Sequence, residues 1–452
     1  MGAGSPPKAL IRVEPARGRS HPTMLRSEAH ETAANINRRD MNEPTRVFNR
    51  REFLGRATSA AAAFAVLGPS VMPAQTNEAA PAPAPKRKIK LGQVGLGGRG
   101  SWIAGMFSQH GGYEYHAVAD YFPEVAGVRG QKLGVPPERC FSGLSGYERV
   151  IESGVEAVVL ETPAFFFPGH AAAAVDAGLH VYMAKPVAAD VPGTLSIAAS
   201  GLAATAKNRV LLVDYQIPTE PINIEIRQDI LDGALGELAY VNTFGIFDGC
   251  SDPPREKTIE SRLRDLVWVN DVALGCDYIG NYDIHALDAA LWVLGRLPVA
   301  ATGGSRICRR DPHGDSKDVI DVLYEHADGL VHTHVGQALR NVADRMLTAK
   351  FFGRDGYAEM TYWGRSILRG NIKSRAGKIE NLHPNGAMRN IASFYDCIVN
   401  GHFENGTVPR ARDSCLLCIL GREAAARRTR LTMDELLREN KKLEVDLTGL
   451  KA

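Results

Sequence analysis

The sequence predicts an α/β protein in two parts, a doubly wound parallel sheet followed by an α+β region with a large open, mainly antiparallel sheet. Three observations support this prediction. Short apolar strands alternate with helical segments between residues 88 and 216, and a glycine-rich turn, GLGGRG at 95–100, joins the first strand to the first helix. Beyond residue 217 this alternation ends and the pattern becomes mixed, with a hairpin at 319–337.

Composition and charge exclude several classes of protein. The chain has 452 residues, 44% of them apolar and 23% charged, which is ample for two folded domains and untypical of a disordered or fibrous chain. Residues 1–74 hold 11 basic and 6 acidic side chains, which leaves 42 basic and 45 acidic in the remainder. This remainder gives no electrostatic reason to bind nucleic acid.

The seven cysteines do not predict a disulfide framework, because they are odd in number and scattered. Cys415 and Cys418 form a CxxC inside the apolar run SCLLCILGREAAA. A spacing of three places both on one helix face. We expect a buried helical pair there rather than a redox or metal pair.

The first 74 residues predict an export leader. Arg50 and Arg51 in NRREFLG precede the apolar run ATSAAAAFAVLG and resemble a twin-arginine signal. The run has about a dozen residues, fewer than the roughly 20 that span a bilayer. We expect a leader over 1–74 with translation starting at Met41, an Ala/Pro linker over 75–87, and export to the periplasm or beyond by the twin-arginine machinery.

Residues 88–216 predict a Rossmann dinucleotide-binding domain. The apolar strand Ile89–Val94 runs into a GxGxxG motif that opens a helix, and such a turn brings the backbone and the helix N-terminus close to a pyrophosphate. The expected cofactor contacts in the motif are Gly95, Leu96, Gly97, Gly98, Arg99 and Gly100. Asp120 ends the second strand, where a carboxylate would bond ribose hydroxyls and favour NAD. Arg99 could reach a 2′-phosphate, so NADP stays possible.

Further strands are expected at 155–161, 179–185 and 209–216. Ligands in doubly wound sheets bind at the carboxyl ends of the strands. Thr162, Pro163, Lys185 and Pro186 fall at those ends.

Residues 217–445 predict the α+β domain, with roles in substrate binding and oligomerisation. We expect a strand over 238–247, a hairpin of 319–326 with 330–337, and helices over 284–294, near 390–400 and over 413–428. The histidines of the hairpin, His326, His332 and His334, lack an accompanying carboxylate or cysteine pattern. We therefore predict ordinary sheet residues and no metal site.

The segment 275–295 contains the best catalytic candidate. Helical spacing places Asn281 and His285 on one face, with Asp288 and Trp292 further along the same stripe. Asp283 is expected to cap the helix N-terminus, and Asp288 to be structural. A core histidine that caps its helix is the alternative for His285.

Together these motifs resemble the Gfo/Idh/MocA family of glucose-fructose oxidoreductases and inositol dehydrogenases. The resemblance rests on GLGGRG, AVAD, TPAFFFPGHAAAAVDAGLHVYMAKPVA at 162–188 and IHALDAALWVLG at 284–295, and covers about residues 88–440. It implies that Lys185 replaces the lysine of the EKP motif, contacting nicotinamide ribose and substrate before a cis proline. Ala184 stands where the family has Glu.

The resemblance also implies roles in the second domain. The family has Asp at the position of Asn281 and a base at that of His285, so His285 would take the hydroxyl proton with Asp283 or Asp288 orienting it. Lys185, His285 and Asn281 are therefore the expected catalytic residues, with His285 as the base and Lys185 as the cation that steadies the developing alkoxide. His170 joins Thr162 and Pro163 as an expected cofactor contact. The expected substrate contacts are Tyr215, Gln216, Asp283, Trp363 and Arg389.

The sequence thus predicts an exported NAD(P)-dependent oxidoreductase that acts on a hydroxyl of a sugar, polyol or glycoside. Because the periplasm has no soluble pool of the cofactor, we expect it to be held tightly and recycled in place. We also expect a homo-oligomer. Two alternatives stay open: cleavage of a glycosidic bond by oxidation, elimination and hydration without net redox change, and a non-catalytic sugar or dinucleotide sensor.

Overall fold

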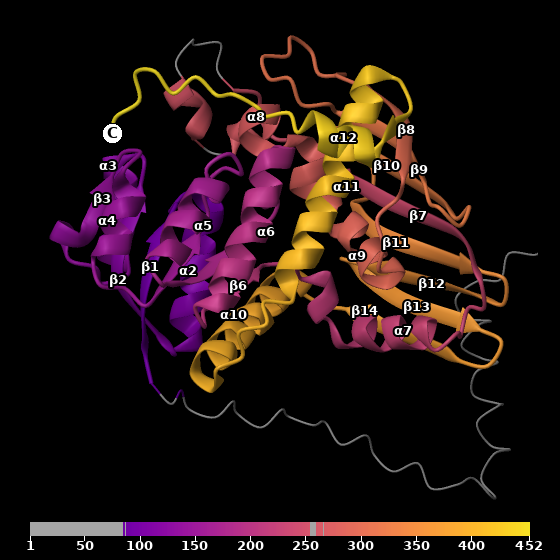
Figure 1. Ribbon diagram of the computed structural model, residues 1–452, viewed down its shortest axis with the longest axis horizontal. Helices are drawn as coiled ribbons and strands as arrows, with labels where there is room; N and C mark the ends of the chain where they lie inside the picture. Colours follow the sequence, from indigo (N-terminus) through magenta and orange to yellow (C-terminus); the bar gives the residue numbers. More distant parts are fainter. Residues whose placement is uncertain (1–84, 86, 254–258, 265) are drawn as a thin grey trace, which may run out of the picture. The chain divides into compact units, whose positions relative to one another are not determined.

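The computed structural model describes residue 85 and residues 87–253, 259–264 and 266–452 (Figure 1). The chain separates into two compact units, 1–81 and 82–452, and the described residues all belong to the second. The expected leader with Arg50 and Arg51, the start at Met41 and nearly all of the linker lie outside the described residues.

The first half of the described chain is built on a six-stranded parallel sheet in the order β3-β2-β1-β4-β5-β6. Its strands are β1 (Ile89–Val94), β2 (Tyr113–Asp120), β3 (Cys140–Ser142), β4 (Ala157–Leu160), β5 (His180–Met183) and β6 (Leu211–Val213). The helices between them are α2 (Gly98–His110), α3 (Pro123–Lys132), α4 (Gly146–Glu152), α5 (Phe167–Asp176) and α6 (Val191–Ala206).

The second half is built on a nine-stranded sheet in the order β14-β13-β12-β11-β7-β10-β9-β8-β15, antiparallel except between β7 and β10. Its strands are β7 (Leu238–Phe247), β8 (Ala300–Arg306), β9 (Val319–Glu325), β10 (Val331–Ala338), β11 (Met346–Gly353), β12 (Gly356–Thr361), β13 (Gly364–Gly370), β14 (Ser374–Ile379) and β15 (Leu431–Thr432). Its helices are α7 (Pro221–Leu231), α8 (Val272–Gly275), α9 (Ile284–Leu294), α10 (Leu382–Asn400), α11 (Thr407–Arg427) and α12 (Met433–Glu439).

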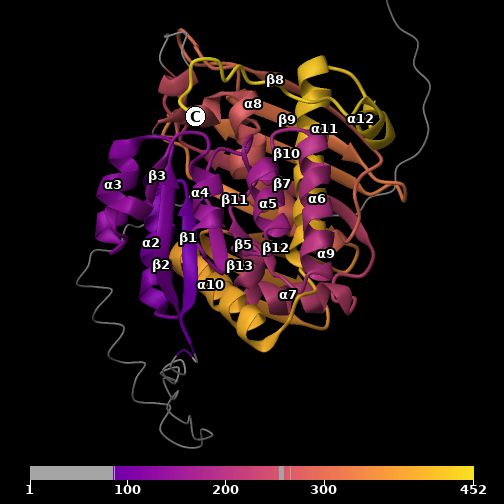
Figure 2. The same cartoon turned by 60° about the vertical axis from the view of Figure 1, so that its left-hand side comes forward.

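Helices join the two sheets into one packed body (Figure 2). One face of the parallel sheet packs on α2 and α10, and the other on α4, α5 and α6. The second of these cores continues through α11 to strands β8 and β9. Helix α9 packs on β7 and β11, so its residues lie between the sheet and the first half. Among the described residues, no helix has the length and apolarity to cross a membrane.

The structure confirms the predicted fold class of a parallel α/β sheet followed by a mainly antiparallel sheet. Strand 238–247 and helix 284–294 have the expected bounds, and the 319–337 hairpin forms. The expected helix near 390–400 begins earlier, at Leu382, because Pro384 lies in the first turn, where proline is tolerated. The strands β11–β14 between 346 and 379 were not predicted, since glycines and charged residues interrupt their apolar alternation.

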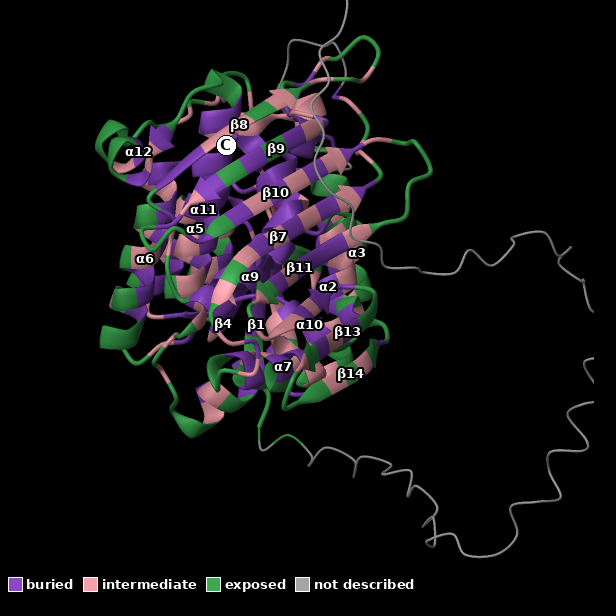
Figure 3. Ribbon diagram, turned by 90° about the vertical axis from the view of Figure 1, so that its right-hand side faces the viewer, coloured by how far each residue is buried: buried purple, intermediate pink, exposed green. Residues whose placement is uncertain are grey.

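One face of the nine-stranded sheet has no helix over it among the described residues (Figure 3). Buried and less buried residues alternate along β7 and β10, as expected of a sheet packed on one side. The open side carries exposed apolar side chains, including Leu323, Val331 and Phe352, which are 42%, 43% and 37% exposed.

After α12 the chain returns over both halves, as the yellow trace in Figure 1 shows. The Leu443 amide donates to an Asp190 carboxylate oxygen at 2.8 Å. Further along, the Leu144 amide donates to the Lys451 carbonyl at 2.9 Å, and the Lys451 amide donates to the Tyr121 hydroxyl at 3.2 Å. This tail, residues 440–452, thus holds the loops that follow β2 and β3.

Candidate active site

A cavity of about 790 Å³ lies at the carboxyl ends of β1, β2, β4 and β5 and extends to the N-terminal end of α9. This is the edge of a doubly wound sheet where ligands bind. Its size is within the usual range for small-molecule and cofactor sites. Every expected cofactor contact lines it except Leu96: Gly95, Gly97, Gly98, Arg99, Gly100, Asp120, Thr162, Pro163, His170, Lys185 and Pro186.

The glycine turn between β1 and α2 has the shape that a phosphate group requires. Gly95 has φ +92°, and a Cβ there would lie 2.6 Å from the Glu161 carbonyl oxygen. A Cβ on Gly100 would lie 2.2 Å from the Gly95 carbonyl oxygen. By contrast, a Cβ on Gly97 or Gly98 would meet nothing within 4 Å. The backbone therefore borders free space at the N-terminus of α2, where anions bind well, and the residues present fit a dinucleotide pyrophosphate.

Asp120 ends β2 beside this turn. Its carboxylate accepts hydrogen bonds from the Leu96 amide at 2.8 Å and the Phe122 amide at 3.1 Å. Leu96 is fully buried, so its contribution is this backbone bond and not a side-chain contact with a ligand. The Asp120 carboxylate is thereby held at the wall of the cavity, in the place expected for an acid that meets ribose hydroxyls.

The expectation that Arg99 could reach a 2′-phosphate is not supported by the position of its guanidinium. Arg99 Nε lies 3.0 Å from Glu161 Oε2, and Nη2 lies 2.5 Å from Asp214 Oδ2. Both carboxylates are almost fully buried, so the Nε and Nη2 atoms of Arg99 are committed to acids inside the protein. Buried carboxylates hold such a cation strongly, because breaking the pair would leave an unpaired buried charge.

Lys185 follows β5 and begins a cis Lys185–Pro186 peptide bond, as the sequence resemblance implies. Its Nζ donates to the backbone carbonyl of Asn281 and lies 5.7 Å from the centroid of the Tyr282 ring. Burial and the neighbouring Arg99 charge lower the pKa of Lys185 to about 7. The amine is therefore substantially neutral at neutral pH. Ala184, at the position where the family has Glu, is buried and also lines the cavity.

Asn281 and His285 both line the cavity, but the helical geometry differs from the expectation. Residues Ile279–Asp283 form a π-helical turn, so a regular α-helical spacing of four does not relate the two side chains. The Asn281 amide donates to the Gly275 carbonyl instead of holding His285. Burial and the nearby Lys185 charge hold the pKa of His285 well below its usual range.

The acids expected to cap this helix or orient His285 do neither. Asp283 makes no capping hydrogen bond, and its Oδ2 lies 3.1 Å from Nε2 of His334 on β10. It does not line the cavity. Asp288 is fully buried and accepts from Arg410 Nε at 3.0 Å and from the Ser414 hydroxyl at 2.7 Å. Both acids are therefore committed elsewhere, and His285 Nδ1 has no hydrogen-bond partner within the part of the chain that the structure describes.

The other expected substrate contacts divide into two groups. Gln216 and Trp363 line the cavity. Tyr215 lies behind it, with its ring centroid 6.3 Å from that of His285. Arg389 pairs with Glu220 at 2.7 Å and does not line the cavity. The sequence therefore placed Tyr215, Asp283 and Arg389 nearer to the site than they lie.

The other cysteines and histidines singled out in the sequence lie in buried elements. Cys415 and Cys418 are buried on α11 as expected. The hairpin histidines are buried, and the described residues contain no group of three or more His, Cys, Asp or Glu side chains arranged to hold a metal ion.

The cavity has an aromatic wall that sequence reasoning missed. The Phe247 and Tyr282 rings stack with centroids 3.9 Å apart, and Trp268 and Tyr362 also line the cavity. These residues come from β7, the π-helical turn, a 3₁₀ turn and the end of β12, which no sequence spacing brings together.

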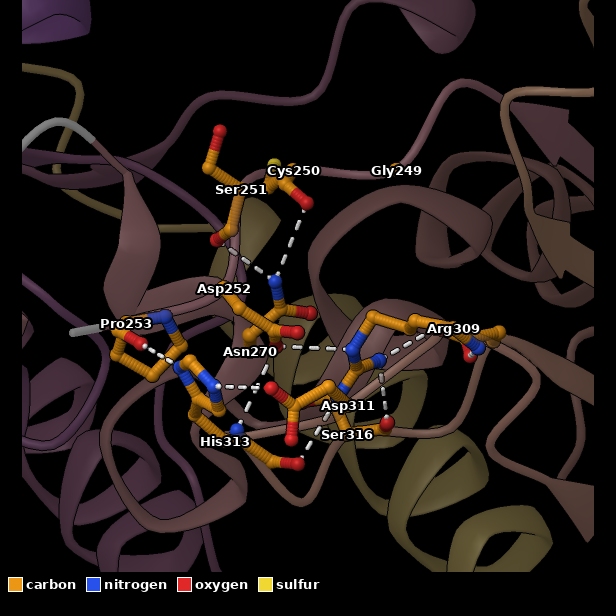
Figure 4. A network of polar contacts seen from close by, with 12 residues as sticks. Gly249, Cys250, Ser251, Asp252, Pro253, Asn270, Arg309, Asp311, His313 and Ser316 are labelled. Carbon is orange, nitrogen blue, oxygen red and sulfur yellow. Dashed lines mark hydrogen bonds and ion pairs between the residues drawn. The ribbon is translucent and has the colours of Figure 1, made fainter. Parts of the chain in front are cut away.

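A polar network holds the chain where it leaves β7 beside this wall (Figure 4). Arg309 Nε lies 2.8 Å from Asp252 Oδ1. The Asn270 amide donates to the Ser251 carbonyl at 2.8 Å and to the Cys250 carbonyl at 3.2 Å. Since Trp268 and Val269 precede Asn270 and line the cavity, these contacts fix that part of its wall.

Glu161 and His383 also line the cavity without having been predicted. Glu161 immediately follows the apolar strand β4, and a charged residue at that position was the signal available in the sequence. His383 stacks on Trp102 with ring centroids 3.9 Å apart, and no sequence signal links residues so distant along the chain.

Comparisons with known proteins give the fold. No protein-family model matches the chain, and no curated protein does either. Among solved structures, an aldose-aldose oxidoreductase from Caulobacter crescentus with glycerol is 20% identical, covering 76% of this chain and 100% of its own, with a TM-score of 0.62.

Two more structures show the same fold. A levoglucosan dehydrogenase in complex with NADH and levoglucosan is 16% identical, covering 77% of this chain and 100% of its own, with a TM-score of 0.63. An inositol dehydrogenase homologue from Azotobacter vinelandii with NAD⁺ is 18% identical, covering 77% and 98%, also at 0.63. The described chain therefore has the fold found in these sugar and inositol dehydrogenases.

Proposed function

We propose that this protein is an NAD-dependent oxidoreductase of the Gfo/Idh/MocA type, acting on a hydroxyl group of a sugar, polyol or glycoside. One observation carries the proposal. A single cavity joins a glycine turn shaped for phosphate and the Asp120 carboxylate to two proton-exchanging groups, the Lys185 amine and the His285 imidazole.

The residues that would hold the dinucleotide are those of the glycine turn, Asp120 and the Thr162–Pro163 segment. The Asp120 carboxylate would repel a 2′-phosphate, and Arg99 is paired with buried acids, so NAD is favoured over NADP. Bound there, a nicotinamide would supply the acceptor for a hydride from the carbinol carbon.

The chain itself must take the hydroxyl proton. The sequence assigned this step to His285 and expected Lys185 to act as a cation. Electrostatics instead favour Lys185 as the base, because a base works best with a pKa near the working pH. The pKa of Lys185 is about 7, whereas that of His285 is well below its usual range. We assign the proton to the neutral Lys185 amine. His285 stays neutral, and its imidazole, which lines the cavity, can bond the hydroxyl and orient it.

The aromatic wall supports a carbohydrate as the substrate. Apolar walls with a few placed polar groups are typical of small-molecule sites. Phe247, Tyr282 and Trp363 line the cavity with apolar surface that suits the C–H groups of a sugar ring, while Gln216 and His285 line it with polar groups. The related structures bind levoglucosan and glycerol, which are polyhydroxyl compounds.

Two measurements test the proposal. Mass spectrometry of denatured protein should detect NAD released from the purified protein or bound after incubation with it. A panel of aldoses, inositols and anhydrosugars should then reduce the bound nicotinamide, and Lys185→Ala should abolish the reduction. A fully active Lys185→Ala variant would refute the role of Lys185.

The two alternatives have separate tests. Redox-neutral glycoside cleavage predicts a free sugar product with no net change in the cofactor, which product analysis detects. A non-catalytic sugar or dinucleotide sensor would be favoured if Lys185 and His285 faced separate cavities. They line the same cavity, so catalysis is favoured.

Two further parts of the proposal concern location and assembly. The Arg50–Arg51 motif supports export by the twin-arginine route, testable by fractionating cells that express the full chain. The uncovered sheet face, with Leu323, Val331 and Phe352, supports association of identical subunits. Light scattering of the purified protein tests this, and a Phe352→Glu variant should shift the protein toward the monomer.

A further inference from the structure

A buried cluster of four charges lies beneath the glycine turn. Glu161 follows β4, Lys185 follows β5, Asp214 follows β6, and Arg99 extends from the first turn of α2. The side chains of Glu161 and Asp214 are 1% and 0% exposed. Each buried carboxylate in this cluster needs a cation close to it, because an unpaired buried charge is strongly unfavourable.

The two carboxylates have different surroundings. Asp214 accepts from Arg99 Nη2 at 2.5 Å and from the Asn390 amide at 2.7 Å. Glu161 has the Arg99 Nε at 3.0 Å, but no donor in the described chain makes a hydrogen bond of good geometry to either of its oxygens. Asp214 is thus satisfied by the protein, whereas Glu161, which lines the cavity, has acceptor capacity to spare.

The sheet places Glu161 beside the lysine segment. Leu160 of β4 is in register with Met183 of β5, and the Ala184 amide donates to the Leu160 carbonyl at 3.2 Å. The next pair in that register is Glu161 and Ala184. Both line the cavity, and Ala184 has no charge. A carboxylate therefore flanks Ala184 from each neighbouring strand, Glu161 after β4 and Asp214 after β6, and of the two it is Glu161 that lines the cavity.

We propose that Glu161 is a positioning residue that acts from the neighbouring strand and sets the proton affinity of the Lys185 amine. This deepens the proposed function and rests on it, since Lys185 takes the substrate proton there. When Lys185 gains that proton, the Glu161 carboxylate balances the new positive charge.

The electrostatics of both groups support the assignment. Burial raises the pKa of Glu161 to about 7, and burial lowers that of Lys185 to about 7. The charges of Asp214 and then Glu161 raise the pKa of Lys185 against the effects of burial and Arg99. Removing the Glu161 carboxylate should therefore lower the pKa of Lys185 further, so that its amine becomes reactive at a lower pH.

The test measures the Lys185 amine directly and needs neither dinucleotide nor turnover. The full chain is treated with trace acetic anhydride at a series of pH values, and mass spectrometry quantifies acetylation of Lys185. Three variants are compared with the wild type: Glu161→Gln, the swap Glu161→Ala/Ala184→Glu, and the control Glu156→Gln. Glu156 pairs with Arg87 on the surface just before β4 begins, at the other end of the same strand.

We expect the midpoint of Lys185 acetylation to fall by about one pH unit or more in Glu161→Gln, and to stay unchanged in Glu156→Gln. The swap should return it toward the wild-type value, because the carboxylate reappears beside the same lysine. An unchanged midpoint in folded Glu161→Gln overturns the proposal. If that variant does not fold, the swap decides: a wild-type midpoint supports the proposal and a lowered one overturns it.

The outcome is separable from that of the proposed function. If the protein binds no dinucleotide but Glu161→Gln still lowers the acetylation midpoint, the proposed oxidoreductase function is refuted and the Glu161–Lys185 coupling is supported. If the protein oxidises sugars but Glu161→Gln leaves the acetylation midpoint unchanged, the oxidoreductase function is supported and the coupling is refuted. In an active protein, the low-pH limb of kcat/KM should move to lower pH in Glu161→Gln by the same amount as the acetylation midpoint.

Discussion

The pH dependence of sugar oxidation should report the protonation of Lys185. With a pKa of about 7, the amine is about one tenth neutral at pH 6 and about nine tenths neutral at pH 8. Since only the neutral amine takes a proton, kcat/KM should rise roughly tenfold from pH 6 to pH 8 and then level off. An ordinary lysine, with a pKa of about 10.4, would keep rising far beyond pH 8.

The assay follows the absorbance of reduced nicotinamide in initial-rate measurements between about pH 5 and 9, using the best substrate of the sugar panel. In Lys185→Met, the rise of kcat/KM between pH 6 and pH 8 should disappear. The rate should fall by a factor of about 10²–10⁴, the usual contribution of a general base. His285→Asn is the matched control, because the pKa of His285 lies well below its usual range and cannot produce a midpoint near 7. A midpoint below about pH 6 that disappears in His285→Asn would assign the base to His285 and refute the reasoning.

The remaining predictions concern the turn, the ribose acid and the core. Gly100→Ala forces a Cβ to within 2.2 Å of a backbone oxygen, so it should cost about 1–3 kcal/mol in thermal unfolding and weaken NADH binding. Gly105→Ala on the same helix meets nothing within 4 Å and should be neutral or stabilising; equal behaviour of the two variants would contradict this. Asp120→Ala should narrow the preference for NAD over NADP, measured as the ratio of the two Kd values. Asp288→Ala should lower stability by about 3–5 kcal/mol, since it strips a buried acid from its partners, and a fall in activity without a fall in stability would argue against a structural role.

The sequence predicted the parts of the site that depend on local chain geometry. A glycine turn between a strand and a helix and an acid at the end of the second strand are set by neighbours in sequence. Lys185 before a cis proline was instead implied by the family resemblance. Strand 238–247 was also predictable, because it buries one periodic face. Helix 284–294 was predictable as an apolar run of helical length, and it is buried on every side except at Trp292.

What the sequence missed depends on contacts between distant segments or on irregular backbone. The π-helical turn at 279–283 changed the partners of Asn281 and Asp283, and no periodicity in the sequence announces such a turn. Arg99 is paired with Glu161 and Asp214, which follow other strands of the same sheet. The pairing of Asp283 with His334 likewise joins residues 51 positions apart.

The contacts of the tail with the loops after β2 and β3 bear on the order in which the molecule is made. The hydrogen-bond partner of the Leu144 amide, the Lys451 carbonyl, lies 307 residues further along the chain. A ribosome needs roughly 15–60 s to synthesise that length of chain. The loops at the Asp120 end of the site form these hydrogen bonds with the tail only when synthesis is nearly complete. Firm retention of a nucleotide is therefore expected to be a late event, after both sheets have formed.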